Sequence, residues 1–303
     1  MKIAILMSTY NGHNYLDEQL KSIAEQTIIN DIRLYIRDDG SSDDTFEIIE
    51  KWRNKINIIL YKGSNIGPAK SFWELFMNSD IKADYYAFCD QDDVWDTDKV
   101  EKGVIKLSKC FGKPMLWCSN CRIINEKGDI VSTSMNTEVP QFNIAAQFVC
   151  GTTQGCAMMF NDELRKLVLI KSFSGNPMHD FVIMTNSIIY GSVIYDHTPS
   201  FSYRVHRDNV VEKNGKSFFS RILNTLNRWF SKNHKSEMSK YADELLKKDN
   251  DSVMLGDKVF LCNIIKSKSS IKSRFWLLSN SINKTSNKGA IRSFRIRGLL
   301  GIL

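Results

Sequence analysis

The sequence predicts an α/β fold with a mainly parallel sheet, followed by a basic, mainly helical region. Apolar runs alternate with helical patterns over the first 110 residues, and each of the four apolar runs ends in a polar turn. The chain has 303 residues, 43% of them hydrophobic and 25% charged, which is enough to bury a full core. This composition excludes disordered, collagenous and small disulfide-rich classes of protein.

Strand and helix patterns take turns along the first half of the chain. The expected strands are the apolar runs at 2–8, 32–39, 56–63 and 85–90. Helical spacing is expected over 14–25, over 45–55 after a cap at Asp43 or Asp44, and from Asn65-Ile66-Gly67 through Phe76.

The alternation weakens after residue 110. A turn at 126–129 that contains Gly128 predicts a hairpin between 116–125 and 130–135. A looser stretch then runs to Gly151. The remaining elements are expected as a strand at 155–160, helices at 161–170 and 179–191, and a closing strand pair within 192–206.

Polar residues stand at the carboxyl ends of the four strands. They are Thr9 and Asn11, Asp38 and Asp39, Asn65 and Gly67, and Asp90 and Asp92. Ligands bind outside the carboxyl ends of the strands in parallel sheets. Four clusters on one edge therefore predict a single site.

Asp90 and Asp92 follow a buried apolar strand, so both carboxylates emerge at the mouth of the sheet. Two carboxylates one residue apart suit a hard divalent cation, Mg²⁺ or Mn²⁺, that also meets phosphate oxygens. Such an ion neutralises charge on a departing diphosphate. The D-x-D pattern alone is common in solvated loops, and its context strengthens the interpretation.

Five ordered motifs carry a family resemblance: STYNG, RDDGSSDDT, SNIGPAKSF, FCDQDDVW, and MHDF followed by YRVH. Together they resemble family 2 glycosyltransferases, in particular bacterial rhamnosyltransferase-like enzymes of polysaccharide assembly. The resemblance covers about residues 1–210 and implies a GT-A fold. It implies a glycosyltransferase domain over 1–212, with a nucleotide-sugar half (1–110) and an acceptor half (111–212), before a basic region over 213–303.

The resemblance also implies a donor site. Asp39 would accept the N3–H of uracil or thymine, and since both bases present that same edge, Asp39 does not distinguish them. The other residues implied to bind the nucleotide are Thr9, Tyr10, Asn11, Asn65, Gly67, Lys70 and Asp90. Asp92 and His206 are implied to hold the metal ion.

On the acceptor side, Asp180 matches the family's catalytic base, although the residue before it is His179 rather than glutamate. Asp180 would deprotonate the acceptor hydroxyl as it attacks the anomeric carbon, with inversion; without the resemblance, capping a helix is an equal interpretation. Gln154 and Gly155 are candidates for sugar contact. His179 is expected either to orient the base or a sugar hydroxyl, or to be only a polar residue at the start of a helix. Trp95 is expected either to stack on a sugar or to lie in the core.

The expected function is thus an inverting, metal-dependent transfer of a sugar from a nucleotide-diphosphate donor, dTDP-rhamnose before UDP-hexoses, to a saccharide. The resemblance implies a lipid-linked acceptor in capsule, O-antigen or cell-wall synthesis. A haloacid dehalogenase-type phosphatase, from YAFCDQDDV, and a non-enzymatic basic scaffold are the alternatives. Neither G-x-G-x-x-G after the first strand nor G-x-x-x-x-G-K-[ST] occurs, which argues against dehydrogenases and P-loop proteins.

Charge is unevenly distributed. Residues 213–303 hold 19 Lys/Arg and 6 Asp/Glu, whereas 1–212 hold 22 and 28. The pattern at 217–232, with Phe, Trp and Leu among cations, predicts an amphipathic helix for an anionic membrane surface, or one that packs on the protein. No nucleic-acid-binding motif is visible, so nucleic acid is not expected.

No apolar run reaches the length of a membrane span, and the first residues do not read as a signal peptide. The expected location is cytoplasmic, at the inner face of the plasma membrane. The seven cysteines lack regular spacing, and the lone Cys118-x-x-Cys121 is interpreted as buried thiols rather than as a zinc or redox site.

Overall fold

The computed structural model describes residues 1–109, 112–171, 178–206, 237–279, 285 and 287–303. The segment 217–232, for which an amphipathic helix is predicted, lies outside them. The chain divides into two compact units. The first comprises 1–139, 153–170 and 178–209, and the second comprises 140–152, 171–177 and 210–303. The domain boundary predicted near residue 212 stays a prediction.

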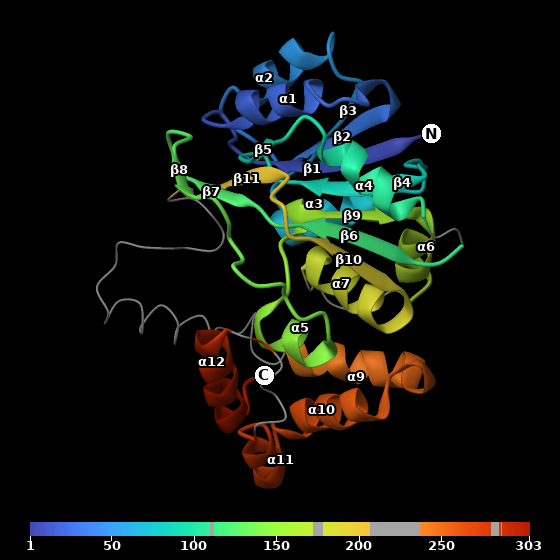
Figure 1. Ribbon diagram of the computed structural model, residues 1–303, viewed down its shortest axis with the longest axis vertical. Helices are drawn as coiled ribbons and strands as arrows, with labels where there is room; N and C mark the ends of the chain where they lie inside the picture. Colours follow the sequence, from blue (N-terminus) through green and yellow to red (C-terminus); the bar gives the residue numbers. More distant parts are fainter. Residues whose placement is uncertain (110–111, 172–177, 207–236, 280–284, 286) are drawn as a thin grey trace. The chain divides into compact units, whose positions relative to one another are not determined.

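A seven-stranded, mostly parallel sheet organises the first unit (Figure 1). Its strands, in spatial order, are β10 (Ser192–Asp196), β6 (Met115–Ser119), β9 (Met158–Asn161), β4 (Tyr85–Cys89), β1 (Ile3–Thr9), β2 (Ile32–Asp38) and β3 (Ile58–Lys62). All neighbours pair in parallel except β9, which is antiparallel to both β4 and β6. The predicted α/β class is confirmed.

The helices of the first unit connect these strands. They are α1 (Leu16–Ala24), α2 (Thr45–Trp52), α3 (Pro68–Met77), α4 (Lys99–Leu107), α6 (Asp162–Lys171) and α7 (His179–Tyr190). The amphipathic spacing of α3 buries Phe72, Leu75 and Phe76. Gly67 precedes this helix with φ of +85°, and Pro68 fills its first position, where a missing N–H costs nothing.

A smaller sheet of four short strands has the order β5 (Val94–Trp95), β11 (Phe201–Arg204), β7 (Arg122–Ile124) and β8 (Ile130–Ser132). The predicted hairpin is present as β7 and β8, although β6, which the prediction had merged with β7, belongs to the larger sheet. The predicted closing pair over 192–206 is wrong. β10 pairs with β6, whereas β11 pairs with β5 and β7.

The second unit is helical where it is described. It contains α5 (Ile144–Cys150), which lies within the stretch expected to be loose, and α9 (Glu237–Asp249), α10 (Leu255–Lys266), α11 (Ile271–Trp276) and α12 (Lys288–Leu300). Phe260 joins their core, with its ring centroid 6.1 Å from Phe148 and 6.0 Å from Phe294. None of the helices described is long and apolar enough to span a bilayer.

Candidate active site

The ends of β1 and β2 are tied together by short polar contacts. Thr9 is buried, and its Oγ1 donates to Asp38 Oδ1 at 3.1 Å while its carbonyl accepts the N–H of Asp39 at 2.8 Å. Asn11 has φ of 47°, and its Oδ1 accepts the N–H of Ser42 at 2.9 Å. The loops that follow β1 and β2 are therefore held together at the carboxyl edge of the sheet.

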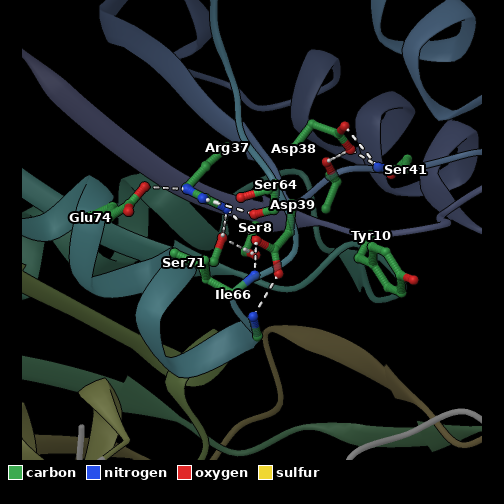
Figure 2. Close-up of polar contacts among 12 residues, drawn as sticks. Ser8, Tyr10, Arg37, Asp38, Asp39, Ser41, Ser64, Ile66, Ser71 and Glu74 are labelled. Atoms are coloured by element: carbon green, nitrogen blue, oxygen red, sulfur yellow. Dashed lines mark hydrogen bonds and ion pairs between the residues drawn. The ribbon is translucent and has the colours of Figure 1, made fainter. Parts of the chain in front are cut away.

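Asp39 is the centre of a buried polar cluster, drawn in Figure 2. Its carboxylate pairs with the guanidinium of Arg37 and accepts the N–H groups of Ile66 and Gly67, each at 2.9 Å. Arg37 also pairs with Glu74. Burial opposes the charge of Arg37, but the two carboxylates outweigh it and raise the pKa of the guanidinium.

These contacts occupy most of the hydrogen-bond acceptor positions of Asp39. A carboxylate has about four acceptor positions, and Arg37, Ile66 and Gly67 occupy three, which leaves one on Oδ2. Asp39 is only 2% exposed. Recognition of a base by Asp39 stays a prediction, and the structure adds a second task, because Asp39 fixes the loop before α3.

Three other residues predicted to bind the nucleotide lie in that loop, at the start of α3 or after β1. Asn65 and Lys70 are exposed, Asn65 one residue before the Asp39 contacts and Lys70 in the first turn of α3. The Tyr10 ring is exposed, and Figure 2 places it apart from the Arg37 cluster. Its backbone N–H and carbonyl are held by the side-chain amide of Gln91, at 2.9 and 3.1 Å.

A second cluster follows β4. One donor atom from each of Asp90, Asp93 and Cys156 lies within 4.8 Å of the others. Burial, with the charges of Asp92 and Asp180, raises the pKa of Asp90 to about 7, and burial with Asp92 and Asp90 raises that of Asp93 well above its usual value. The carboxyl groups therefore crowd one another, and a bound cation would relieve their repulsion.

Asp92 and His206, the predicted metal ligands, lie together. His206 Nε2 is 2.6 Å from Asp92 Oδ2, and its ring lies 4.7 Å from that of Tyr15. Arg204 of β11 holds the same turn, because its Nε donates to Asp92 O at 2.9 Å and its backbone N–H donates to Asp93 Oδ1 at 3.2 Å. The late β11 segment thus supports the acidic turn that follows β4.

The buried ammonium group of Lys99 lies next to this acidic cluster. Lys99 Nζ donates to the carbonyl of Cys156 at 2.6 Å and lies 4.4 and 3.8 Å from the ring centroids of Trp95 and Phe201. Burial lowers the pKa of Lys99, and the attraction of Asp93 opposes that shift. Lys99 thus offsets part of the negative charge gathered at the end of β4.

The reversed direction of β9 explains how Cys156 reaches this place. In β4, Ala87 pairs with Met159 of β9, so the chain just before β9 lies beside the end of β4. Since β9 is antiparallel, its beginning shares an edge with the carboxyl ends of its parallel neighbours. Residues 154–157 therefore enter the site from the acceptor half of the sequence.

Asp180, the predicted base, belongs to the same site. Its charge acts on Asp90, and its carboxylate accepts N–H groups from Phe181, at 2.7 Å, and from Gly155. Burial, opposed by these hydrogen bonds, raises the pKa of Asp180 to about 6. A carboxylate with this pKa is mostly ionised at neutral pH, and accepts a proton more readily than an ordinary aspartate does.

Two candidates for sugar contact, Trp95 and His179, lie in the interior instead, and for Trp95 this is the core alternative stated above. Trp95 is 3% exposed and its ring packs in the core, so it has no free face on which a sugar could stack. His179 is also 3% exposed, with its ring 4.1 Å from Phe72 and 4.4 Å from Phe88, and burial lowers its pKa to about 3. Both side chains belong to the interior of the first unit.

Gly155 and Gln154 stay candidates for acceptor contact. Gly155 is packed closely, because a Cβ there would lie 2.7 Å from His179 Nε2. Only glycine lets this segment approach α7 and donate its N–H to Asp180. Gln154 is half-buried, with its amide directed at the sulfur of Met135.

Four residues of these clusters are not among those predicted from the sequence: Arg37, Asp93, Lys99 and Cys156. Arg37 carried a usable signal, since a cation inside the apolar run 32–39 needs a buried partner. Lys99 and Cys156 carried none, because their roles depend on contacts across more than fifty residues.

Comparison with known proteins places the chain in a family. The model of the family described as "Glycosyl transferase family 2" matches residues 4–162. The chain belongs to this family. The chain is also 30% identical, over 90% of its own length and 93% of the relative's, to a dTDP-rhamnosyl transferase, RfbG, of Shigella flexneri. The phosphatase and scaffold alternatives are set aside.

Solved structures share the fold of this glycosyltransferase. A structure of residues 1–349 of TarS from Staphylococcus aureus in complex with UDP-GlcNAc has a TM-score of 0.57 at 16% identity, covering 97% of this chain and 90% of that one. The mannosyltransferase PcManGT from Pyrobaculum calidifontis, in complex with GDP-Man and Mn²⁺, has a TM-score of 0.51 at 14% identity, covering 98% and 87%. The predicted GT-A fold is confirmed.

Proposed function

We propose that this glycosyltransferase moves a sugar, with inversion, from a nucleotide-diphosphate donor to a saccharide acceptor. dTDP-rhamnose is the favoured donor, because the relative named a dTDP-rhamnosyl transferase matches over nearly the whole chain; UDP-hexoses come next. The acceptor is a lipid-linked saccharide of capsule, O-antigen or cell-wall synthesis, and the enzyme works at the cytoplasmic face of the membrane.

One observation supports this chemistry more than any other. Residues 155 and 156 lie against both carboxylates, because an oxygen of Asp90 is within 4.8 Å of Cys156 Sγ and a Cβ on Gly155 would be 3.4 Å from Asp180 Cβ. Asp90 comes from the donor half of the sequence and Asp180 from the acceptor half. A transferase needs a base on one side of the reacting carbon and a leaving group on the other. The approach of carboxylates from the two halves supports such an arrangement.

In the reaction, Asp180 takes the proton of the acceptor hydroxyl. The freed oxygen forms a bond to the anomeric carbon as the bond from that carbon to the diphosphate oxygen breaks, and the nucleoside diphosphate leaves. The N–H groups of Gly155 and Phe181 orient the Asp180 carboxylate. The Asp39 cluster fixes the Ile66–Gly67 loop that would lie under the nucleotide.

A divalent cation, Mg²⁺ or Mn²⁺, fits the acidic cluster. The crowding of Asp90, Asp92 and Asp93 favours a cation, and carboxylate oxygens are the ligands that these ions prefer. We propose that Asp92 holds the ion with His206. Asp90, Asp93 and Cys156, whose donor atoms lie within 4.8 Å of one another, form a second group that could supply ligands at the same turn. When bound, the ion neutralises charge on the leaving diphosphate.

The donor assignment is tested with a panel of nucleotide sugars and Mn²⁺ or Mg²⁺, in which release of nucleoside diphosphate is measured. We expect dTDP-rhamnose to be consumed at least about tenfold faster than UDP-glucose, UDP-galactose or UDP-N-acetylglucosamine. Asp92→Asn, which removes a metal ligand, should abolish release, whereas Asp98→Asn, on the surface, should not. Consumption of no donor in the presence of metal would refute the proposed function.

The pH dependence follows from Asp180. Because its pKa is raised to about 6, the basic form is present above that pH and is lost as the pH falls through it. Asp90, whose pKa is raised to about 7, takes up its proton as the pH falls toward 6, and His179 is neutral in this range. We expect kcat/KM to fall about tenfold per pH unit below pH 6. A profile that stays flat to pH 4.5 would contradict the role of Asp180.

A further inference from the structure

The last 46 residues are strongly basic. Residues 258–303 contain no Asp or Glu, and ten Lys or Arg: Lys258, Lys266, Lys268, Lys272, Arg274, Lys284, Lys288, Arg292, Arg295 and Arg297. Such a stretch attracts anionic surfaces. Because it contains no acidic residues, no side chain within it repels the negative charge of such a surface. Charge alone does not define a contact surface, so the apolar residues among these cations matter.

The short helix α11 exposes two large apolar side chains. Ile271 is 68% exposed and Phe275 is 63% exposed. They are four residues apart, so both lie on one face of the helix. Lys268 and Lys272 flank this face and are exposed as well.

The helix is held firmly by the rest of its unit, so this exposure is not a sign of a loose end. Arg274 donates to the carbonyls of Ser267 at 2.7 Å, Lys268 at 3.0 Å and Leu299 at 3.4 Å. The contact with Leu299 places the end of α12 beside α11, where Leu299 and Leu300 are partly exposed. A helix of six residues is stable only through such packing.

We propose that α11 and the adjoining end of α12 form a surface that docks on an anionic lipid bilayer, with Ile271 and Phe275 entering the headgroup region. Apolar and aromatic side chains surrounded by lysines match the interface of such a bilayer. The apolar side chains are few, whereas a stable contact with a protein needs a larger, well-packed patch. This surface refines the membrane part of the proposed function and does not depend on the donor.

The experiment measures co-sedimentation of the full chain with vesicles of phosphatidylcholine alone or mixed with phosphatidylglycerol. We expect binding to the anionic vesicles only, weakened by salt. The double substitution Ile271→Ser and Phe275→Ser should weaken binding about tenfold, and Lys268→Gln with Lys272→Gln about as much. The matched control is Ile105→Ser with Ile170→Ser, two helical residues of the first unit that are 51% and 80% exposed; it should bind like the wild type.

Donor turnover on a soluble acceptor is measured for every variant, and we expect no change. This readout separates the docking surface from the catalytic proposal, because loss of turnover would concern the enzyme and loss of sedimentation the surface. Equal binding by the wild type and the Ile271/Phe275 variant would overturn the inference. Equal binding to neutral and anionic vesicles, or sedimentation with neither, would overturn it as well.

Discussion

Replacement of Asp180 by asparagine is expected to lower kcat by a factor of about 10²–10⁴ while the donor still binds. Asparagine has almost the shape of aspartate, and its carbonyl oxygen can still accept the N–H of Phe181. What it loses is the ability to take a proton from the acceptor hydroxyl, a contribution of this size in enzymes that use a positioned base. Steady-state turnover and calorimetric titration of the nucleoside diphosphate measure the two quantities.

Asp162→Asn serves as the matched control. Asp162 also begins a helix, and its Oδ1 accepts the hydroxyl of Tyr86 at 3.1 Å, but it lies at the start of α6. If Asp180 only stabilised its helix, both variants would lower the melting temperature and neither would lose turnover selectively. Retention of more than a tenth of wild-type kcat by Asp180→Asn would rule out the base.

Arg37→Met is expected to cost about 3–5 kcal/mol of stability, because it leaves the carboxylate of Asp39 buried without its cation. Asp39 is 2% exposed and cannot regain water. The Ile66–Gly67 loop, which Asp39 holds by two N–H groups, should loosen at the same time and weaken nucleotide binding. Urea unfolding midpoints and nucleotide titration check both effects.

Two further variants show whether the effect belongs to the pair. Arg53→Met removes a cation that pairs with Glu50 on the surface, where both side chains are more than a third exposed, and should cost about 1 kcal/mol or less. The double variant Arg37→Met with Asp39→Asn should be less destabilised than the two single losses added together. Additive losses would show that Arg37 and Asp39 act independently.

Much of the donor half could be predicted from local patterns. The apolar runs that become β1, β2, β3 and β4 are bounded by polar turns, and the parallel connection places those turns on one edge. The pairing of late strands could not be predicted, because the partners of β10 and β11 lie about eighty or more residues away along the chain. A strand pattern in the sequence predicts a strand, but it does not predict the strand with which it pairs.

The residues of the candidate site also divide into those that the sequence predicts and those that it does not. Asp90 and Asp92 stand out because carboxylates at the end of an apolar run carry a local signal, whereas Asp180 is predicted only through the family resemblance. For Trp95 and His179 the sequence leaves a structural role open beside a role at the site, since a sequence does not distinguish an aromatic ring that meets a ligand from one that fills the core. Cys156 joins the acidic cluster only because β9 runs against its neighbours, which no local pattern indicates.

The way in which Asp39 holds its loop has a consequence for engineering donor preference. The carboxylate binds main-chain N–H groups, and Gly67 supplies a main-chain angle of +85°, so neither contact depends on the side chains at positions 65 and 66. Those two positions can be randomised in a library while the scaffold beneath them stays intact. Selection for turnover with other nucleotide sugars would then test whether this loop contributes to the choice of nucleobase.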